Sequence, residues 1–453
     1  MRSTRLIALV GAVVLVAGMA ACSSDNKSST DNGRIDGTGK TLDVFMGANT
    51  IYPDQQRQWF TDVSNKFQQL TGATVKFETF ASANDELTKI QTSVLSGQGP
   101  DIYALGTTFT PTAYATGAFL TLGDDEWKKL GGKDKFLPAT LGISGPDEAH
   151  LVGIPFASRP FVMAYNKDLL AAAGIQAPAT SWDGLLAQAR QLTKGDTYGL
   201  AVAYADSFDP WKFIWAMNIQ AGNPTVDGNT AKIDDPTTVA AYKTYLSWLA
   251  TDKVVDPAAV GWKNAQAIAA FGAGKAAFLP MVSASSKVTL DKSSVAGHYA
   301  YALMPTVPPG ASATAANGVA ATSILSGDNV VIAKYTKNKD LALALVNMLT
   351  SAQSQTDYYH IFGDLPTNKE AAQALESDPA LAPIVDSAGK SHGTPFNGAW
   401  SQVQLALVNV VVQSIPNLSA GKVDDAALRK LIGDAQKTAQ DALDKNTGQA
   451  GRI

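Results

Sequence analysis

The feature of this sequence that most constrains its fold is an alternation of strand and helix patterns between residues 41 and 106. Three apolar runs, 41–48, 73–80 and 99–106, have the length and composition of buried strands. Between them, apolar side chains recur at helical spacing, first from residue 53 and then from residue 84. Strand, helix, strand, helix and strand in this order predict a parallel sheet covered by helices.

The same alternation continues further along the chain. Residues 150–157 and 160–175 contain strand-like runs that pass into a helix, and a helix with a hydroxyl cap is predicted over 180–193. Further helical patterns occupy 236–250, 262–273, 340–350 and 400–412, whereas 283–326 is rich in Ser, Ala, Gly and Pro. Since 453 residues are too many for one simple core, we expect two α/β lobes with helical additions.

The N-terminus has the pattern of a secretion signal. Arg2 and Arg5 precede an uncharged apolar run, 6–17, which is shorter than the roughly 20 residues that span a bilayer. Small residues then lead to Cys22, the only cysteine of the chain, and this arrangement resembles the signal of bacterial lipoproteins. Such signals prefer Leu three residues before the cysteine, where this chain has Met19. The alternative is a plain signal followed by an incidental cysteine.

The resemblance implies that Cys22 carries a lipid that anchors the protein on the outer face of the membrane. Residues 1–21 are then the signal peptide. Residues 22–40 are rich in Ser, Asp, Asn, Gly and Lys and contain almost nothing to bury, so we interpret them as a flexible tether.

Composition and motifs exclude several function classes. A formal net charge of −4 gives no electrostatic reason to expect a nucleic-acid partner. The four histidines lie far apart and none has a metal-ligand spacing, so we expect no metal. No phosphate-binding loop, dinucleotide fingerprint or serine-nucleophile elbow is present, and we expect no cofactor. The sequence does not exclude a glycosidase, because the two catalytic carboxylates of such an enzyme can be far apart in the chain.

Four stretches carry a family resemblance. They run from "KFQQLTGATVKFETF" to "ATGAFLTL" (66–122), from "VGIPFASRPFVMAYNKDLLAAAGI" to "PATSWDGLLAQARQLT" (152–193), through "AIAAFGAGKAAFLPM" (267–281), and from "GDNVVIAKYTKNKDLALALVNML" to "DLPTNKEAA" (327–372). In this order they resemble the extracellular solute-binding proteins of bacterial ABC importers, in the carbohydrate-binding class similar to maltose-binding protein.

The resemblance implies a type II periplasmic-binding-protein fold, with two lobes that are each a mainly parallel sheet flanked by helices. Lobe one is expected at 41–156 and 300–360, lobe two at 158–297 and 366–443, and a tail at 444–453. The ligand would bind in the cleft between the lobes, which are joined by a hinge. The closed form would then dock on membrane permease subunits, and we expect a monomer.

Aromatic side chains that could stack on a sugar face are the first site candidates. The resemblance places Trp211, within the loop 207–215 after a strand of lobe two, and Trp400, at the start of a late helix, in the cleft. For both, the alternative is a place in the core. Trp215 and Trp262 are weaker candidates.

The polar candidates follow predicted strands. Asn49 follows the first strand, and Thr107 and Thr108 follow the third, where relatives hold sugar hydroxyls. The guanidinium of Arg159 could hold hydroxyls or an anionic group of the ligand, or form an ion pair between the lobes. After "AAFLPM" many relatives have an aromatic residue, whereas this chain has Val282 and Ser283, so its ligand need not match theirs.

The sequence therefore predicts a substrate-binding lipoprotein that captures a sugar or oligosaccharide for an ABC importer, without catalysis. One alternative is a receptor for an anionic or phosphorylated solute such as a glycerophosphodiester or uronate, motivated by Arg159. A second alternative, from another class, is a secreted glycoside-processing enzyme, which requires a carboxylate pair with shifted pKa values in the cleft.

Overall fold

The first sheet of the computed structural model has six strands in the order β12–β4–β11–β3–β1–β2. The structure describes residues 35–375 and 377–450. The strands are β1 (Thr41–Gly47), β2 (Thr74–Phe80), β3 (Ile102–Gly106), β4 (Ile154–Ser158), β11 (Gly327–Ile332) and β12 (Leu365–Pro366). β1 pairs in parallel with β2 and β3, and α1 (Pro53–Thr71) and α2 (Ala83–Ser96) connect them, as the sequence predicts.

Local sequence explains why α1 begins and ends where it does. Pro53 occupies the first helical position, where its missing N–H costs nothing. Trp59, Val63 and Phe67 form the buried face. Gly72 then ends the helix in a left-handed conformation, with φ of 80° and its N–H donated to the carbonyl of Gln68.

The second sheet has four strands in the order β10–β5–β9–β6. They are β5 (Val162–Asn166), β6 (Tyr198–Leu200), β9 (Ala276–Val282) and β10 (Tyr299–Ala302). The helices of this region are α6 (Lys167–Ala172), α7 (Trp182–Leu192), α8 (Pro210–Gln220), α9 (Pro236–Ala250), α10 (Asn264–Gly272) and α11 (Ser286–Leu290), with a 3₁₀ turn η3 (Pro257–Gly261) and a small hairpin of β7 (Val226–Asp227) and β8 (Thr230–Ala231).

Both sheets are mixed, which corrects the expectation of mainly parallel sheets. In the first sheet β11 is antiparallel to β3 and β4, and β12 is antiparallel to β4. In the second, β5 is antiparallel to β9 and β10, and only β6 pairs in parallel. The reason is topological: strands that enter a sheet from the other sheet have no helical crossover to impose a parallel direction.

The chain passes between the sheets more than once. It leaves the first sheet after β4 and rejoins it at β11. The sequence predicted that the chain re-enters lobe one at residue 300. However, β10 pairs with β5 in the second sheet, so strand pairing puts the re-entry at β11. The other boundaries of the predicted lobes stay a prediction.

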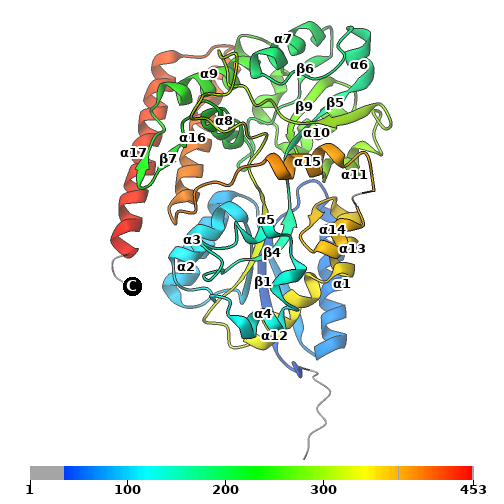
Figure 1. Cartoon of the computed structure of the whole chain (residues 1–453), viewed down its shortest axis with the longest axis vertical. Coiled ribbons are helices and arrows are strands. Elements are labelled where there is room, and N and C mark those ends of the chain that lie inside the picture. The colour runs from blue at the N-terminus through cyan, green and yellow to red at the C-terminus, as the bar shows by residue number, and fades with distance from the viewer. Residues whose placement is uncertain (1–34, 376, 451–453) are drawn as a thin grey trace, which may run out of the picture. The chain divides into compact units, whose positions relative to one another are not determined.

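The remaining helices lie around these sheets. Small ones follow β3 and precede β4: η1 (Thr107–Phe109), α3 (Thr110–Ala115), α4 (Asp124–Lys129), η2 (Lys133–Lys135) and α5 (Pro138–Leu141). The C-terminal third contains α12 (Lys339–Leu349), α13 (Ala352–Phe362), α14 (Lys369–Gln373), α15 (Ala382–Lys390), α16 (Trp400–Ser419) and α17 (Asp425–Ala450). α16 packs against α17, α8 and α9, so the C-terminal helices complete the second part of the fold (Figure 1).

Separate apolar clusters form around the two sheets. Trp59 and Trp127 belong to a cluster of the first, and Trp182 and Trp248 to the largest cluster of the second. Trp59 and Trp248 are both buried.

Two features of the ends of the chain bear on the predictions. Cys22 and the tether 22–40 lie largely outside the described residues, which begin at Ile35, so the predicted anchor is not part of the structure. Within the described part of the chain, no helix combines the length and hydrophobicity that a membrane span requires.

Candidate ligand-binding cavity

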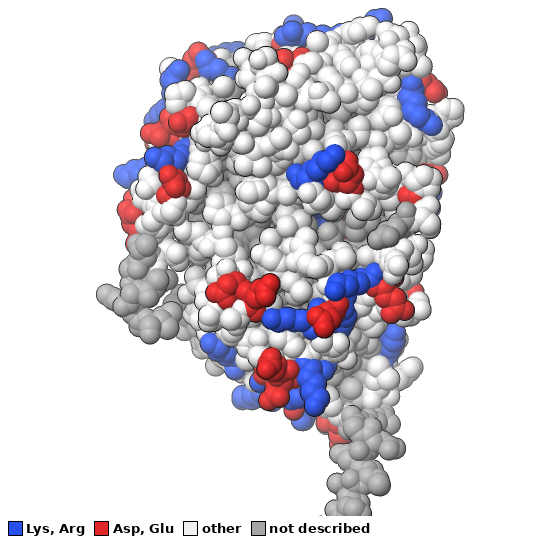
Figure 2. All heavy atoms as spheres, viewed as in Figure 1, with Lys and Arg blue, Asp and Glu red and all other residues white. Residues whose placement is uncertain are grey.

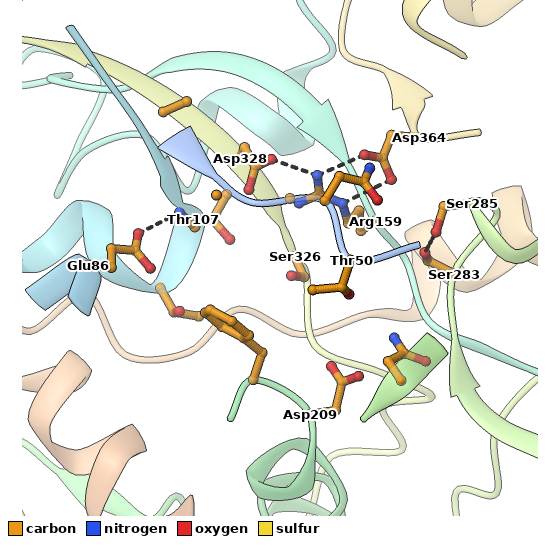
Figure 3. A pocket seen from close by; sticks show the side chains of 18 of the residues that line it. Thr50, Glu86, Thr107, Arg159, Asp209, Ser283, Ser285, Ser326, Asp328 and Asp364 are labelled. Carbon is orange, nitrogen blue, oxygen red and sulfur yellow. Dashed lines mark hydrogen bonds and ion pairs between the residues drawn. The ribbon is translucent and has the colours of Figure 1, made fainter. Parts of the chain in front are cut away.

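A cavity of about 260 Å³ is lined by residues from both sheets and their connections. The first sheet contributes the chain after β1, the turn η1 after β3, and the residues next to β4, β11 and β12. The second contributes the segment before α8 and the residues after β9. In Figure 3, Glu86 and Thr107 lie on one side, Ser283 and Ser285 on another, and Asp209 faces them from the α8 region.

Asn49 lines the cavity but its side-chain oxygen is already engaged. Asn49 Oδ1 accepts hydrogen bonds from the backbone N–H groups of Ile51 (3.1 Å) and Tyr52 (2.9 Å). Gln56 holds the same loop, accepting from the N–H of Asn49 and donating to the carbonyl of Gly47. Asn49 therefore shapes the loop that ends β1, and only its side-chain amide nitrogen is left to meet a ligand.

Thr107 and Thr108 both line the cavity from η1, where the sequence placed them. They are 7% and 8% exposed. The Oγ1 of Thr107 is buried without a hydrogen-bond partner among the described residues. A buried hydroxyl without a hydrogen-bond partner destabilises the fold. This atom is therefore a candidate to form a hydrogen bond with a ligand in the cavity.

Glu86 of α2 lines the same side of the cavity and is 1% exposed. Its Oε1 accepts a hydrogen bond from the N–H of Gly106 at 3.0 Å. Burial raises the pKa of Glu86 well above its usual value, and this outweighs the opposing effect of the Gly106 hydrogen bond. Glu86 was not predicted from the sequence, because its position on a helix facing a strand end gives no local signal.

Arg159 lines the cavity and forms two ion pairs (Figure 3). Its Nε donates to Asp364 Oδ1 at 2.9 Å, and its Nη2 donates to Asp364 Oδ2 at 2.7 Å and to Asp328 Oδ2 at 2.6 Å. Asp328 lies in β11 and Asp364 comes just before β12, and these two strands flank β4 in the first sheet. The ion pair is therefore made within one sheet, not between the lobes.

The aromatic candidates occupy different places. Trp211 lines the cavity, but it lies in the first turn of α8 and not in a loop, and it is only 1% exposed. Trp400 is fully buried and is not among the residues that line the cavity. Its ring packs edge-on against Trp211, with centroids 5.9 Å apart. Trp400 thus supports Trp211 from behind, which differs from the predicted direct contact with ligand.

Gln404, one helical turn after Trp400, lines the cavity from α16. It is 2% exposed, and its Oε1 has no hydrogen-bond partner among the described residues. The weaker candidate Trp215 is 1% exposed and packs on His392, away from this cavity. A polar residue four positions after a buried Trp on a helix was a signal that the sequence analysis did not use.

The second side of the cavity contributes acidic groups that the sequence analysis also missed. Asp206 accepts hydrogen bonds from the N–H groups of Phe208, Asp209 and Asn264. Burial, followed by the nearby charge of Asp209, raises the pKa of Asp206. Lys212 is paired with Asp209.

The chemistry of this lining suits a neutral, hydroxyl-rich ligand. Aromatic and apolar side chains alternate with hydroxyl, amide and carboxylate groups, which together satisfy the faces and the hydroxyl rim of a sugar. Within the described residues, no group of three or more His, Cys, Asp and Glu side chains is arranged to hold a metal ion.

Comparison with known proteins identifies the family. The model of the bacterial extracellular solute-binding protein family matches residues 52–356, which is more than half of the chain. The chain belongs to this family. The predicted resemblance is thereby confirmed, and so is the location that the family description implies, outside the cytoplasm.

Curated relatives of this solute-binding protein cover most of its length. It is 25% identical over 446 residues to the diacetylchitobiose binding protein DasA of Streptomyces coelicolor, covering 96% of this chain and 98% of that one. It is 23% identical to a probable ABC transporter-binding protein of Deinococcus radiodurans, over 60% of this chain and 65% of the relative.

Solved structures of similar fold confirm the predicted fold class. A solute-binding protein of an ABC transporter from Thermotoga lettingae superimposes with a TM-score of 0.72 at 20% identity, covering 89% of this chain and all of that one. The MalE3 protein of T. maritima gives a TM-score of 0.71 at 18% identity, over 87% and 98% of the two chains.

Proposed function

We propose that this solute-binding protein captures a neutral sugar or short oligosaccharide in the cavity and delivers it to the permease of an ABC importer. The observation that carries the proposal is the lining. Both sheets contribute to it, it combines Trp211 with hydroxyl and amide groups, and both of its cations, Arg159 and Lys212, are paired with carboxylates.

The relatives support the same ligand class. The Streptomyces protein is named for diacetylchitobiose. Proteins of similar fold were solved with tagatose, ribitol, maltose and maltotriose. All of these are uncharged and rich in hydroxyl groups, which suits the hydroxyl, amide and aromatic groups of this lining.

The anionic alternative has less support. It rests on Arg159 as a free cation, but Asp328 and Asp364 occupy its Nε and Nη2. Basic side chains do not gather on the face of the molecule in Figure 2, where they are interspersed with acidic ones. An anion would therefore find no uncompensated positive charge among the described residues of the cavity.

The enzyme alternative requires carboxylates that are free to transfer protons. Glu86 and Asp206 line the cavity and have raised pKa values. However, both oxygens of Asp206 accept backbone hydrogen bonds, and Glu86 holds the N–H of Gly106. These carboxyl groups thus have structural tasks, which favours a receptor without catalysis.

The place of action follows from the N-terminus. Cys22 would carry a lipid that holds the protein on the outer face of the membrane, next to the permease, with the protein acting as a monomer. Radiolabelled palmitate should label the wild-type protein and not Cys22→Ser, which should be released into the medium. A wild-type protein that incorporates no label would contradict the proposal that Cys22 carries a lipid.

The ligand class is tested by thermal unfolding of the purified protein against neutral mono- and oligosaccharides, uronates and sugar phosphates. A neutral sugar at about 100 times its Kd should stabilise the protein by roughly 2.7 kcal/mol. The same samples are then analysed for cleavage products. Stabilisation by charged sugars alone would favour the anionic alternative, and cleavage of an oligosaccharide would favour the enzyme.

A further inference from the structure

Arg159 lies at the end of the middle strand of three. Ser158, the last residue of β4, pairs with β11 on one side and with β12 on the other. Arg159 comes directly after it, and its guanidinium therefore reaches Asp328 in β11 and Asp364 just before β12 (Figure 3). All three side chains line the cavity, so this ion cluster forms part of its wall.

The cluster carries no net positive charge. Two carboxyl groups face one guanidinium. They accept hydrogen bonds from its Nε and Nη2, and Nη1 takes no part in these bonds. Burial raises the pKa of Asp364 and Arg159 opposes the rise. With Asp364 ionised the net charge is −1, and with Asp364 protonated it is zero.

The other cation of the described lining is compensated in the same way. Lys212 is paired with Asp209, and its Nζ lies 4.1 Å from the centre of the Phe161 ring. Glu86 and Asp206 add further carboxyl groups to the lining. An anionic ligand would therefore be repelled or, at best, not attracted.

We propose that Asp328 and Asp364 are specificity determinants that make the cavity prefer neutral over anionic ligands by compensating the charge of Arg159. With its fork held by two carboxylates, Arg159 presents Nη1 to a ligand hydroxyl at a fixed position. This deepens the proposed function, since it assumes a sugar ligand. The exclusion of anions is testable without any sugar.

The first test uses inorganic phosphate as the probe, at low ionic strength, with calorimetric titration of wild-type protein, Asp328→Asn and Asp328→Asn/Asp364→Asn. The wild type should bind phosphate weakly or not at all. The double variant should bind it about tenfold more tightly or better, and added salt should weaken this binding. Adding Arg159→Met to the double variant should abolish the gain.

A matched control is Asp252→Asn. Asp252 is also a mostly buried carboxylate paired with an arginine, Arg190, but neither residue lines the cavity. This variant should behave like the wild type toward phosphate. Asp328 is 19% exposed and makes a single bond to Arg159, so Asp328→Asn should fold even where the double variant does not, as circular dichroism will show.

The second test compares a neutral hexose, glucose, with its uronate, glucuronate. The ratio of their affinities should shift toward glucuronate by about tenfold in Asp328→Asn. Folded variants that leave both the phosphate affinity and this ratio unchanged would overturn the inference, as would a wild type that binds phosphate as tightly as the double variant. If no sugar binds the wild type, the proposed function fails, while the phosphate titration still decides on the role of the two aspartates.

Discussion

Single residues of the cavity wall differ in whether their polar atoms already have partners. Thr107 Oγ1 is buried and has no partner in the part of the chain that the structure describes, whereas the nearby Thr110, fully buried, accepts a hydrogen bond from Asn329 Nδ2 at 3.0 Å. An unsatisfied polar atom is a cost in the unliganded protein, and a satisfied one is not. The two threonines therefore respond differently to the same isosteric substitution.

Thr107→Val should leave the free energy of unfolding of the unliganded protein unchanged or raise it, because it removes an unsatisfied hydroxyl. Its affinity for the sugar should fall. The matched variant Thr110→Val should cost about 1–3 kcal/mol, because it leaves the Asn329 amide without this acceptor. Urea unfolding measures both, and a Thr107→Val that loses as much stability as Thr110→Val would contradict the assignment.

The position of Trp400 behind Trp211 gives a second prediction at this scale. Trp400→Ala empties a fully buried site and should lower the free energy of unfolding by about 3–5 kcal/mol. Affinity should fall only through the displaced Trp211. Trp400→Phe, which retains an aromatic ring, should recover much of both losses. A stable Trp400→Ala variant that has lost all sugar binding would instead restore Trp400 as a direct ligand contact.

At the scale of elements, α2 presents a buried carboxyl group to the cavity. The folded-state pKa of Glu86 is raised, so the folded protein keeps this proton at a pH at which the unfolded chain has lost it. The free energy of unfolding must then fall as pH rises above the ordinary pKa of a glutamate toward the raised value. One such group contributes a slope of up to about 1.4 kcal/mol per pH unit.

Glu86→Gln should flatten this dependence of the free energy of unfolding on pH. The glutamine oxygen can still accept the hydrogen bond from Gly106, but the side chain has no proton to lose. Urea unfolding between pH 5 and pH 8 measures the effect. Glu148→Gln, at an exposed carboxylate, is the control and should keep the wild-type slope. Equal slopes for Glu86→Gln and the wild type would contradict the role of Glu86.

The sequence predicted those elements that have one apolar face. α1, with its buried stripe of Trp59, Val63 and Phe67, was recognised from its periodicity, as was α7. α8 was missed and treated as a loop around Trp211. Every one of its residues, Pro210–Gln220, is buried, and a helix that is buried on all sides shows no 3.6-residue period.

At the scale of the whole molecule, side chains join parts of the fold that carry different sheets. The hydroxyl of Tyr52, just before α1, donates to the carbonyl of Ser285, which follows β9. Thr112 of α3 bonds both the carbonyl of Gly398 and the hydroxyl of Ser401 in α16. These contacts join residues more than 200 positions apart, as does the ion pair of Arg159 with Asp364.

Such long-range contacts explain what the sequence could not predict about the site. Thr107, Thr108 and Arg159 were predicted because they follow predicted strands, and Trp211 because the family resemblance placed it in the cleft. All four line the cavity. The partners of Arg159, and Gln404 on a distant helix, reach the cavity only through tertiary packing, which no local pattern records.

Removing the joining hydrogen bonds should loosen the molecule without unfolding it. Tyr52→Phe/Thr112→Val deletes four of them, counting the bond of the Tyr52 hydroxyl to Thr289 Oγ1. It should increase the radius of gyration of the unliganded protein in small-angle scattering, with a sugar ligand reversing the change. Tyr204→Phe, which loses a hydrogen bond to the carbonyl of Tyr245 within the largest cluster of the second sheet, is the control and should not expand. An unchanged radius in the double variant would show that these contacts do not hold the parts together.

The central claim is that one neutral sugar occupies this one cavity. The most direct measurement is a calorimetric titration of the best sugar from the unfolding screen into wild-type protein and into Ser326→Trp, which fills the cavity from a residue whose side chain lines it (Figure 3). We predict one saturable site in the wild type and none in the folded variant. Unchanged binding by Ser326→Trp would contradict the account, because the sugar would then bind elsewhere.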